Sequence, residues 1–171
     1  MQTAPAYADP RFDGIDDPEL MMPAAAHEAG HAIAALAAGF PVREMRLWRE
    51  GGDRVTGYAL IEHSDDPEGD ELNGALITAV AGHEAEAHWL TENHGFQFLG
   101  FRDRSGALSA ARPGCCDDLR LFRTLRRGHR DALTEPAARV RARALLTRRW
   151  RRVERLALRL ARHGHLGNTT A

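Results

Sequence analysis

The 171-residue sequence contains no lysine, only two cysteines and no long run of apolar residues. The cysteines, Cys115 and Cys116, are neighbours, and adjacent residues make poor disulfide partners because the geometry is strained. This predicts a reducing, cytoplasmic setting. The longest apolar runs, 32–40 and 75–81, are far shorter than the roughly 20 residues of a membrane span, and the N-terminus shows no signal peptide. We therefore expect a soluble chain.

All 23 basic residues are arginines, which we attribute to compositional bias rather than to chemistry at particular positions. Residues 1–100 hold 5 Arg and 18 acidic residues, and residues 101–171 hold 18 Arg and 6 acidic residues, giving charges of −13 and +12. The two halves should attract each other. In the arginine-rich stretch 139–162, apolar residues recur at helical spacing, which favours a solvated or acid-paired helix face over a nucleic-acid-binding surface.

The pattern of apolar residues predicts one mainly α-helical domain at residues 20–167, with a small β-hairpin or sheet. Residues 1–19 carry Pro and Asp without periodicity and are predicted to be a mobile leader, and residues 168–171 a tail. Pro23 suits the first turn of a helix that Gly39 ends. Helices are expected at 23–40, 71–92, 117–130 and 134–163, strands at 42–48 and 54–62, a turn at 50–53 and an irregular segment at 96–114.

The run from His27 to His31 reads HEAGH, the pattern HExxH, within the first predicted helix. At 3.6 residues per turn, the two histidines lie on one helix face and can bind one Zn²⁺, with Glu28 beside the metal. The alternative is a pair of core histidines satisfied by hydrogen bonds, because this helix also turns apolar residues toward the core: Ile33, Leu36 and Phe40.

Catalytic zinc usually takes three protein ligands and leaves the fourth position to water. The sequence must therefore supply one more ligand. Candidates lie on the helix predicted at 71–92 and around the start of the helix predicted at 117–130, and periodicity does not choose among them: His83, Glu84, Glu86, His88, Cys115, Cys116, Asp117 and Asp118.

Four segments carry a resemblance to a known family: HEAGHAIAAL at 27–36, VTGY at 55–58, AGHEAE at 81–86 and GCCDDL at 114–119. In order and spacing they resemble the peptidase domain of the FtsH-type AAA zinc metalloproteases. Residues from 143 onward are similar to the closing helix of that domain. The resemblance covers about residues 22–167. Its first motif is highly specific and the others are looser.

The resemblance implies a multi-helical, zincin-type fold and a zinc endopeptidase, with Glu28 as the catalytic base that activates a metal-bound water. It also implies that Asp118 completes the metal site with the two HExxH histidines. Asp117 replaces the Asn that usually precedes this aspartate, and Cys115 and Cys116 stand where the family has other small residues, so a thiolate ligand stays open. His83 replaces an Arg of the family pattern.

The sequence departs from the family by lacking an upstream transmembrane segment, an AAA module and any P-loop glycine-lysine motif. We therefore expect it to cut peptides or unfolded segments, with a separate AAA unfoldase as a conceivable partner. Family members form hexameric rings largely through their ATPase modules, so the oligomeric state stays open. The strand at 54–62 is predicted either to bind an extended peptide at its edge or only to cover the motif helix.

Two other functions are compatible with the sequence. A non-catalytic, zinc-stabilised binding or regulatory domain would need a closed site, with a fourth ligand such as Cys115 or Cys116. Glu28 speaks against it, because a structural zinc site has no use for a proton acceptor. A nucleic-acid binder built on the arginine-rich half would show steeply salt-dependent binding to DNA or RNA.

Overall fold

The structure, a computed structural model, describes residues 18–51, 54–93, 97–98, 101–102, 104–111 and 116–169. These residues are mainly helical, with one three-stranded antiparallel sheet and one short hairpin, as the sequence predicts for a mainly α protein with a small sheet. In chain order the elements are α1 (Pro18–Ala38), β1 (Val42–Gly51), β2 (Arg54–Ile61), α2 (Gly69–Asn93), β3 (Gln97–Phe98), β4 (Phe101–Arg102), α3 (Arg104–Ala111), α4 (Cys116–Arg126), α5 (Glu135–Arg148), α6 (Trp150–His163) and β5 (His165–Thr169).

Helix α1 begins at Pro18, five residues before the predicted start, so Pro23 lies inside the helix rather than in its first turn. The extension buries the side chains of Met21 and Met22, and this burial outweighs the backbone hydrogen bond that Pro23 cannot donate. The helix ends as predicted at Gly39, whose φ is +85°. The amides of Gly39 and Phe40 bond back to the last turn, the pattern of a Schellman cap.

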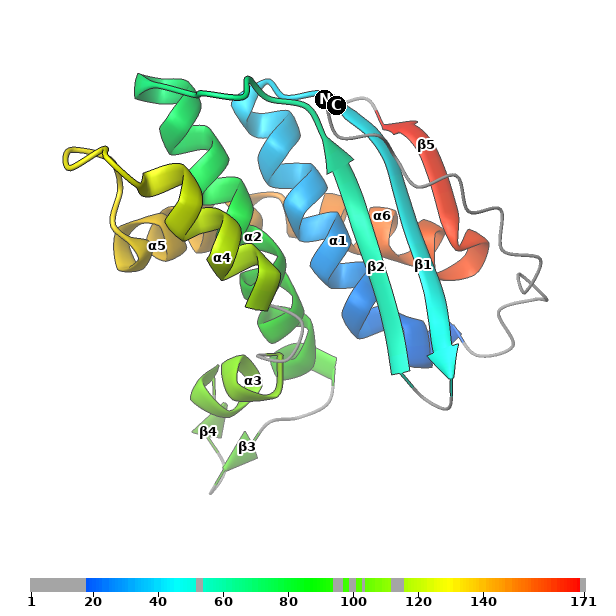
Figure 1. Cartoon of the computed structure of the whole chain (residues 1–171). Coiled ribbons are helices and arrows are strands. Elements are labelled where there is room, and N and C mark those ends of the chain that lie inside the picture. Colours follow the sequence, from blue (N-terminus) through cyan, green and yellow to red (C-terminus); the bar gives the residue numbers. More distant parts are fainter. Residues whose placement is uncertain are drawn as a thin grey trace.

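Helices α1 and α2 form the centre of the molecule, and small residues let them approach closely. A Cβ added at Gly30 would lie 2.5 Å from the Cβ of Ala85 and 2.7 Å from the carbonyl oxygen of Ala81. The two helices run antiparallel, so residues early in α1 face residues late in α2 (Figure 1). This close contact sets the position of both motif histidines against α2.

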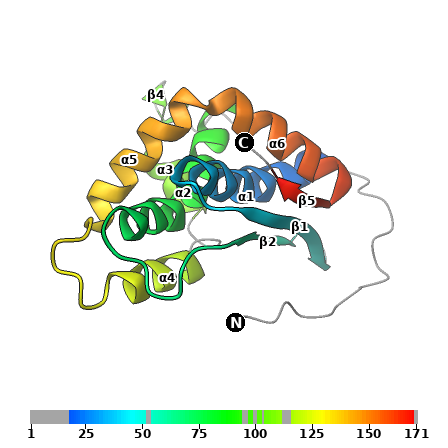
Figure 2. The same cartoon turned by 90° about the horizontal axis from the view of Figure 1, so that it is seen from above.

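The sheet has the strand order β2-β1-β5, and all three strands are antiparallel to their neighbours. Strands β1 and β2 form the predicted hairpin, with Leu47 opposite Gly57, while residues 52–53 of the predicted turn lie outside the described residues. Strand β2 is therefore an edge strand of this sheet. Figure 2 shows that β2 and α4 lie on the same side of the α1–α2 pair, with α5 and α6 on the other side.

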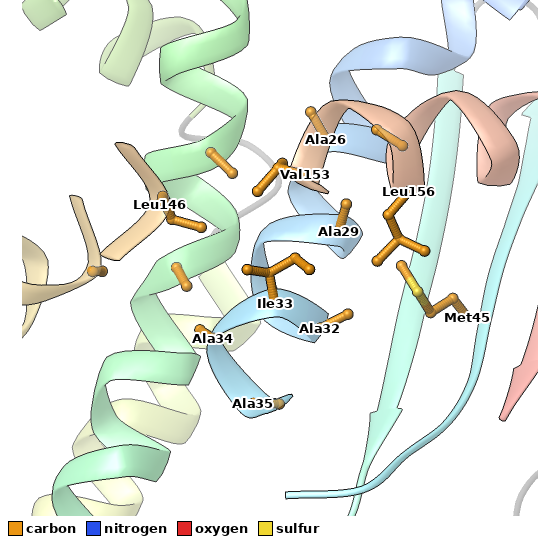
Figure 3. Packing of buried hydrophobic residues seen from close by; sticks show 14 of the residues in the cluster. Ala26, Ala29, Ala32, Ile33, Ala34, Ala35, Met45, Leu146, Val153 and Leu156 are labelled. Carbon is orange, nitrogen blue, oxygen red and sulfur yellow. The ribbon is translucent and has the colours of Figure 1, made fainter. Parts of the chain in front are cut away.

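The hydrophobic core surrounds α1. The residues of α1 that point into the core are mostly alanines, which leave room for larger side chains from β1, α5 and α6. Figure 3 shows four of these larger side chains: Met45, Leu146, Val153 and Leu156. Ala29, Ala32 and Ala35 are fully buried. Small side chains thus bring the surrounding elements close to α1, and the helix that carries the HExxH motif is packed on several sides.

Three sequence predictions about the C-terminal half are wrong. The single helix predicted at 134–163 is two helices that meet at Arg149, because Leu146 packs toward α2 while Val153 and Leu156 pack on α1 from another direction. The segment predicted as irregular contains helix α3. Residues 168–169 of the predicted tail belong to β5, which pairs with β1 after Gly164 turns the chain with φ +66°.

The predicted mobile leader lies outside the described residues up to residue 17, and residues 18–19 belong to α1. Within the described segments, every helix is too short or too polar to cross a bilayer.

Candidate metal centre

His27, His31 and Asp118 come together although 91 residues separate the first from the last. The Nε2 atoms of the two histidines are 3.1 Å apart. Asp118 Oδ2 lies 3.0 Å from His27 Nε2 and 3.3 Å from His31 Nε2. Three potential ligand atoms thus form a nearly equilateral triangle, with both histidines buried and Asp118 partly buried. The residues predicted as metal ligands are the residues that the fold brings together.

Each histidine is held through its other ring nitrogen by α2. His31 Nδ1 lies 2.7 Å from the carbonyl oxygen of Thr78, which can only accept, so Nδ1 carries the proton and donates. His27 Nδ1 lies 2.9 Å from Glu86 Oε2 and donates to that carboxylate. Such partners fix the ring orientation and the tautomer of metal-binding histidines. Each neutral ring then presents an unprotonated Nε2 to the triangle.

With both rings neutral, the triangle would consist of two nitrogen lone pairs and a carboxylate oxygen, three acceptors with no donor among them. This arrangement is unfavourable unless a cation or a proton lies between them. A tetrahedral zinc site with bonds of about 2.0–2.1 Å separates its ligand atoms by about 3.3 Å. The separations here, 3.0, 3.1 and 3.3 Å, are close to that spacing, and two imidazoles with one carboxylate are ordinary zinc ligands. The donor set fits Zn²⁺.

Charge at the triangle shifts the pKa values of its members. Burial lowers the pKa of His27, but hydrogen bonds with Asp118 and Glu86 outweigh it and hold the pKa well above 6.5. Burial also lowers the pKa of His31, but the charge of Asp118 and its hydrogen bond outweigh this effect, so that the net shift is upward. Burial raises the pKa of Asp118, but the charges and hydrogen bonds of the two imidazoles outweigh it and hold it far below its usual range. Asp118 is a stable anion.

Glu28 lies beside the triangle and is 7% exposed. Burial raises the pKa of its carboxyl, and the attraction of the two histidines offsets only part of this effect. Strand β2 passes over it: a Cβ added at Gly57 would lie 3.2 Å from Glu28 Cγ. The same Cβ would lie 2.6 Å from the carbonyl oxygen of Arg46, so glycine lets β2 pair with β1 directly above Glu28.

The other candidate ligands lie elsewhere. Asp117 is exposed and accepts a hydrogen bond from Arg120, 2.8 Å away. The ring of His88 packs edge-on against Trp150, with centroids 4.1 Å apart. Cys116 is exposed at the start of α4, and Cys115 lies outside the described residues.

His83 and Glu84 serve a separate buried network. Arg139 of α5 donates to His83 Nδ1 at 2.9 Å and to Glu84 Oε1 at 3.1 Å, and the Glu84 side chain is 1% exposed. His83 Nε2–H donates to the carbonyl oxygen of Leu108. Burial lowers the pKa of His83, which is consistent with a neutral ring. His83 therefore joins α2 to α3 and α5, a structural role that the sequence did not reveal.

Glu86 is the functional residue whose role the sequence missed. It was one of several candidate ligands, but the structure makes it the hydrogen-bond partner of His27. A signal was present: Glu86 follows Gly82 by one helical turn, and Gly82 packs directly on the histidine rings. Because Glu86 lies one turn from the point where Gly82 contacts the histidine rings, its carboxylate can reach the ring of His27.

No protein-family model matches the sequence, and no curated protein gives a significant match to it.

Proposed function

We propose that this protein is a zinc-dependent endopeptidase of the zincin type that hydrolyses peptide bonds in peptides or unfolded proteins. The observation that carries the proposal is the triangle of His27, His31 and Asp118 with the buried carboxyl of Glu28 beside it. Three protein ligands are the number that catalytic zinc sites use. The ordered resemblance to the peptidase domain of FtsH-type proteases supports the same function.

Zinc, when bound, would polarise the substrate carbonyl and make a water molecule acidic enough to attack at neutral pH. His27 and His31 would hold the ion through Nε2, and Asp118 through Oδ2. Glu28 would take the proton from the attacking water and later deliver it to the nitrogen of the departing amine. The raised pKa of Glu28 suits a group that must both accept and return a proton.

The substrate would bind as an extended strand along β2. This strand is an edge of the three-stranded sheet, and an extended peptide can add to such an edge through backbone hydrogen bonds. Gly57 places the middle of β2 above Glu28, so a peptide aligned with this strand would pass next to the metal triangle. Folded proteins do not offer a free extended segment, which restricts the substrates to peptides and unfolded chains unless a separate AAA unfoldase supplies them.

Two variants test the roles of the residues against a matched control. Glu28→Gln should keep one zinc per chain and lose hydrolysis of an unfolded substrate such as fluorescently labelled casein. Asp118→Ala should lose zinc as well as activity. Asp117→Ala is the control, because Asp117 lies next to Asp118 on α4 but points to solvent. Full activity of Glu28→Gln would remove Glu28 as the base. Unchanged zinc in Asp118→Ala would give the ligand role to another residue, with Cys116 the first to check.

The second candidate is a non-catalytic zinc-stabilised binding or regulatory domain. It requires a fourth protein ligand, and the cluster found among the described residues has three. X-ray absorption spectroscopy of the zinc-loaded protein separates the two functions. Three protein ligands and a water oxygen favour the peptidase, whereas a sulfur scatterer at about 2.3 Å would favour the closed structural site.

A further inference from the structure

A second site of a different kind lies at the far end of α4. An open hollow of about 600 Å³ is bounded by the last turn of α4, the turn that follows it and the first residues of α5. In Figure 1 this is the region where the yellow part of the chain connects α4 to α5. Arg126 in its wall is eight residues beyond Asp118, or roughly 12 Å along the helix. The hollow is therefore separate from the metal triangle.

The lining of the hollow is strongly positive. Four arginines line it against a single carboxylate, that of Glu135, which gives the lining a formal charge of +3: Arg123, Arg126, Arg127 and Arg130. The Glu135 carboxylate already accepts a hydrogen bond from Arg139 at 2.9 Å, on the other side of the first turn of α5. Its charge is therefore shared with Arg139, which does not line the hollow.

Three of these arginines are exposed and form no ion pair with any described residue: Arg123, Arg127 and Arg130. Earlier on the same helix, Arg120 is paired with Asp117. The arginines at the hollow thus carry unpaired positive charge, whereas Arg120, earlier on α4, is paired with an acidic residue. An uncompensated group of guanidinium groups around a concave surface favours an anionic ligand.

The walls of the hollow are fixed by hydrogen bonds. Arg126 donates from Nε to the carbonyl oxygen of Leu133 at 3.0 Å, and the amide of Leu133 donates to Asn73 Oδ1 of α2 at 3.2 Å. The turn between α4 and α5 is therefore tied both to α4 and to the central helix. A ligand would not have to order this backbone when it binds, which preserves affinity.

The start of α5 adds a second positive feature. Thr134 and Glu135 line the hollow, and Thr134 has the extended backbone of an N-cap residue without a side-chain capping bond. Amide groups at a helix N-terminus carry a partial positive charge and bind anions, phosphate above all. Pro136 in this turn has no amide hydrogen, so the terminus adds less than the arginines that line the same hollow.

We propose that this hollow binds a small molecule that carries two or more phosphate groups. Arginine recognises phosphate oxygens through two parallel hydrogen bonds, and three unpaired arginines exceed what one phosphate group requires. The volume lies within the range of small-molecule sites, about 300–1,000 Å³. A long nucleic acid would instead contact an extended stripe of arginines, such as the exposed Arg152, Arg155 and Arg159 of α6.

Isothermal titration of the zinc-loaded protein with pyrophosphate tests this site, with inorganic phosphate as the single-phosphate comparison. The test variant is Arg123→Gln/Arg127→Gln/Arg130→Gln, which spares the structural Arg126. The matched control is Arg152→Gln/Arg155→Gln/Arg159→Gln, which removes the same charge from α6. Charge-assisted hydrogen bonds give about tenfold in affinity for each arginine lost, so pyrophosphate should bind at least about 100-fold more weakly to the test variant and nearly unchanged to the control.

Other outcomes would overturn the site. Equal losses in both variants would mean that pyrophosphate senses only the overall positive charge, and a loss confined to the α6 variant would favour an extended polyanion such as nucleic acid. Because the test variant keeps His27, His31 and Asp118, unchanged binding to it would locate pyrophosphate at the metal instead. Equal affinity for phosphate and pyrophosphate would contradict a site for several phosphate groups. None of these results depends on peptidase activity.

Discussion

The contact between Gly82 and the two motif histidines offers the most direct check of the metal centre. Gly82 is on α2, and its missing side chain leaves the space that the imidazole rings occupy. A Cβ at this position would lie 2.2 Å from His31 Nε2, 2.6 Å from His31 Cδ2 and 2.7 Å from His27 Cδ2. Gly82→Ala therefore places a methyl group against the atoms that would bind the metal.

The size of the effect follows from these distances. Non-bonded carbon atoms prefer separations of about 3.5–4.0 Å, so α2 or the rings must move by about 1 Å to accept the methyl group. Metal sites tolerate changes of about 0.2 Å in ligand distance. The triangle of ligand atoms, with sides of 3.0–3.3 Å, cannot absorb the shift. We expect zinc affinity to fall at least about 100-fold, and overpacking to cost about 1–3 kcal/mol in the metal-free protein.

Gly74→Ala is the matched control, because Gly74 lies on the same helix and its Cβ would also be close to a neighbour, 2.9 Å from the Cβ of Ala38. It should lower stability without changing zinc affinity. Zinc affinity is measured by competition with a chromogenic chelator, and stability by thermal unfolding with and without zinc. Wild-type zinc affinity in Gly82→Ala would mean that the rings do not lie against α2 and would refute the metal centre described above.

Three further predictions concern the surroundings of the site. Glu86→Gln should weaken zinc binding about 10–100-fold, because a neutral amide orients and polarises the His27 ring less well; an unchanged zinc dissociation constant would exclude this role. Glu84→Ala should lower the free energy of unfolding by about 2–3 kcal/mol by removing the buried carboxylate that pairs with Arg139, which keeps only Glu135. Glu135→Ala, at the more exposed end of the network, should cost less than about 1 kcal/mol in denaturant titrations. The rise in melting temperature that zinc produces should be larger at about pH 8.5 than at about pH 6. The pKa values of His27 and His31 are raised above 6.5. The charged rings therefore stabilise the metal-free protein fully below pH 6.5, and this stabilisation is lost as pH rises through the raised pKa values. Zinc, in contrast, requires the neutral rings. A zinc effect that does not change with pH would contradict this.

Local features of the sequence were enough to predict the HExxH helix and the hairpin. The spacing of four residues fixes His27 and His31 on one helix face, and Gly39 fixes where that helix ends. Strands β1 and β2 were predicted as two short strand candidates separated by the turn signal at residues 50–53, and the two strands pair as a hairpin. Each of these signals acts within about ten residues of the chain.

The choice between Asp117 and Asp118 is a tertiary property. Adjacent residues on a helix point about 100° apart, so one of the two must face away from α1 and α2. Asp118 shares its face with Phe122, which is buried, and Asp117 shares its face with Leu121, which is 45% exposed. Leu121 and Phe122 are both apolar, so the sequence pattern alone did not show which of the two helix faces is buried. Only the packing of α4 on α2 selects Asp118, and the resemblance supplied that choice.

The break at Arg149 and strand β5 were missed for a related reason. After Pro136 in the first turn, the stretch 137–163 contains no Gly or Pro, and its apolar spacing is helical throughout. The break follows from the different directions of the surfaces that α5 and α6 cover on α2 and α1. Strand β5 contains only five residues and depends on the free edge of β1 for its hydrogen bonds. The surfaces on α1 and α2 and the edge of β1 belong to other parts of the chain, so the sequence of residues 135–169 does not reveal them.

Asp118 and Glu28, two carboxylates beside the histidines, have opposite pKa shifts, and this difference agrees with the separate roles proposed for them. Both lose solvation on burial. For Asp118 the two imidazoles outweigh that loss, so the pKa is lowered and the carboxylate stays ionised at neutral pH, as a metal ligand would require. For Glu28 the loss of solvation outweighs the attraction, so its proton affinity is higher. Bound zinc would lower the pKa of Glu28 by adding positive charge, which leaves a carboxylate able to take a proton from water and to return it to an amine. A peptidase needs this division between a permanent anion and a proton carrier, whereas a structural zinc site needs only the first.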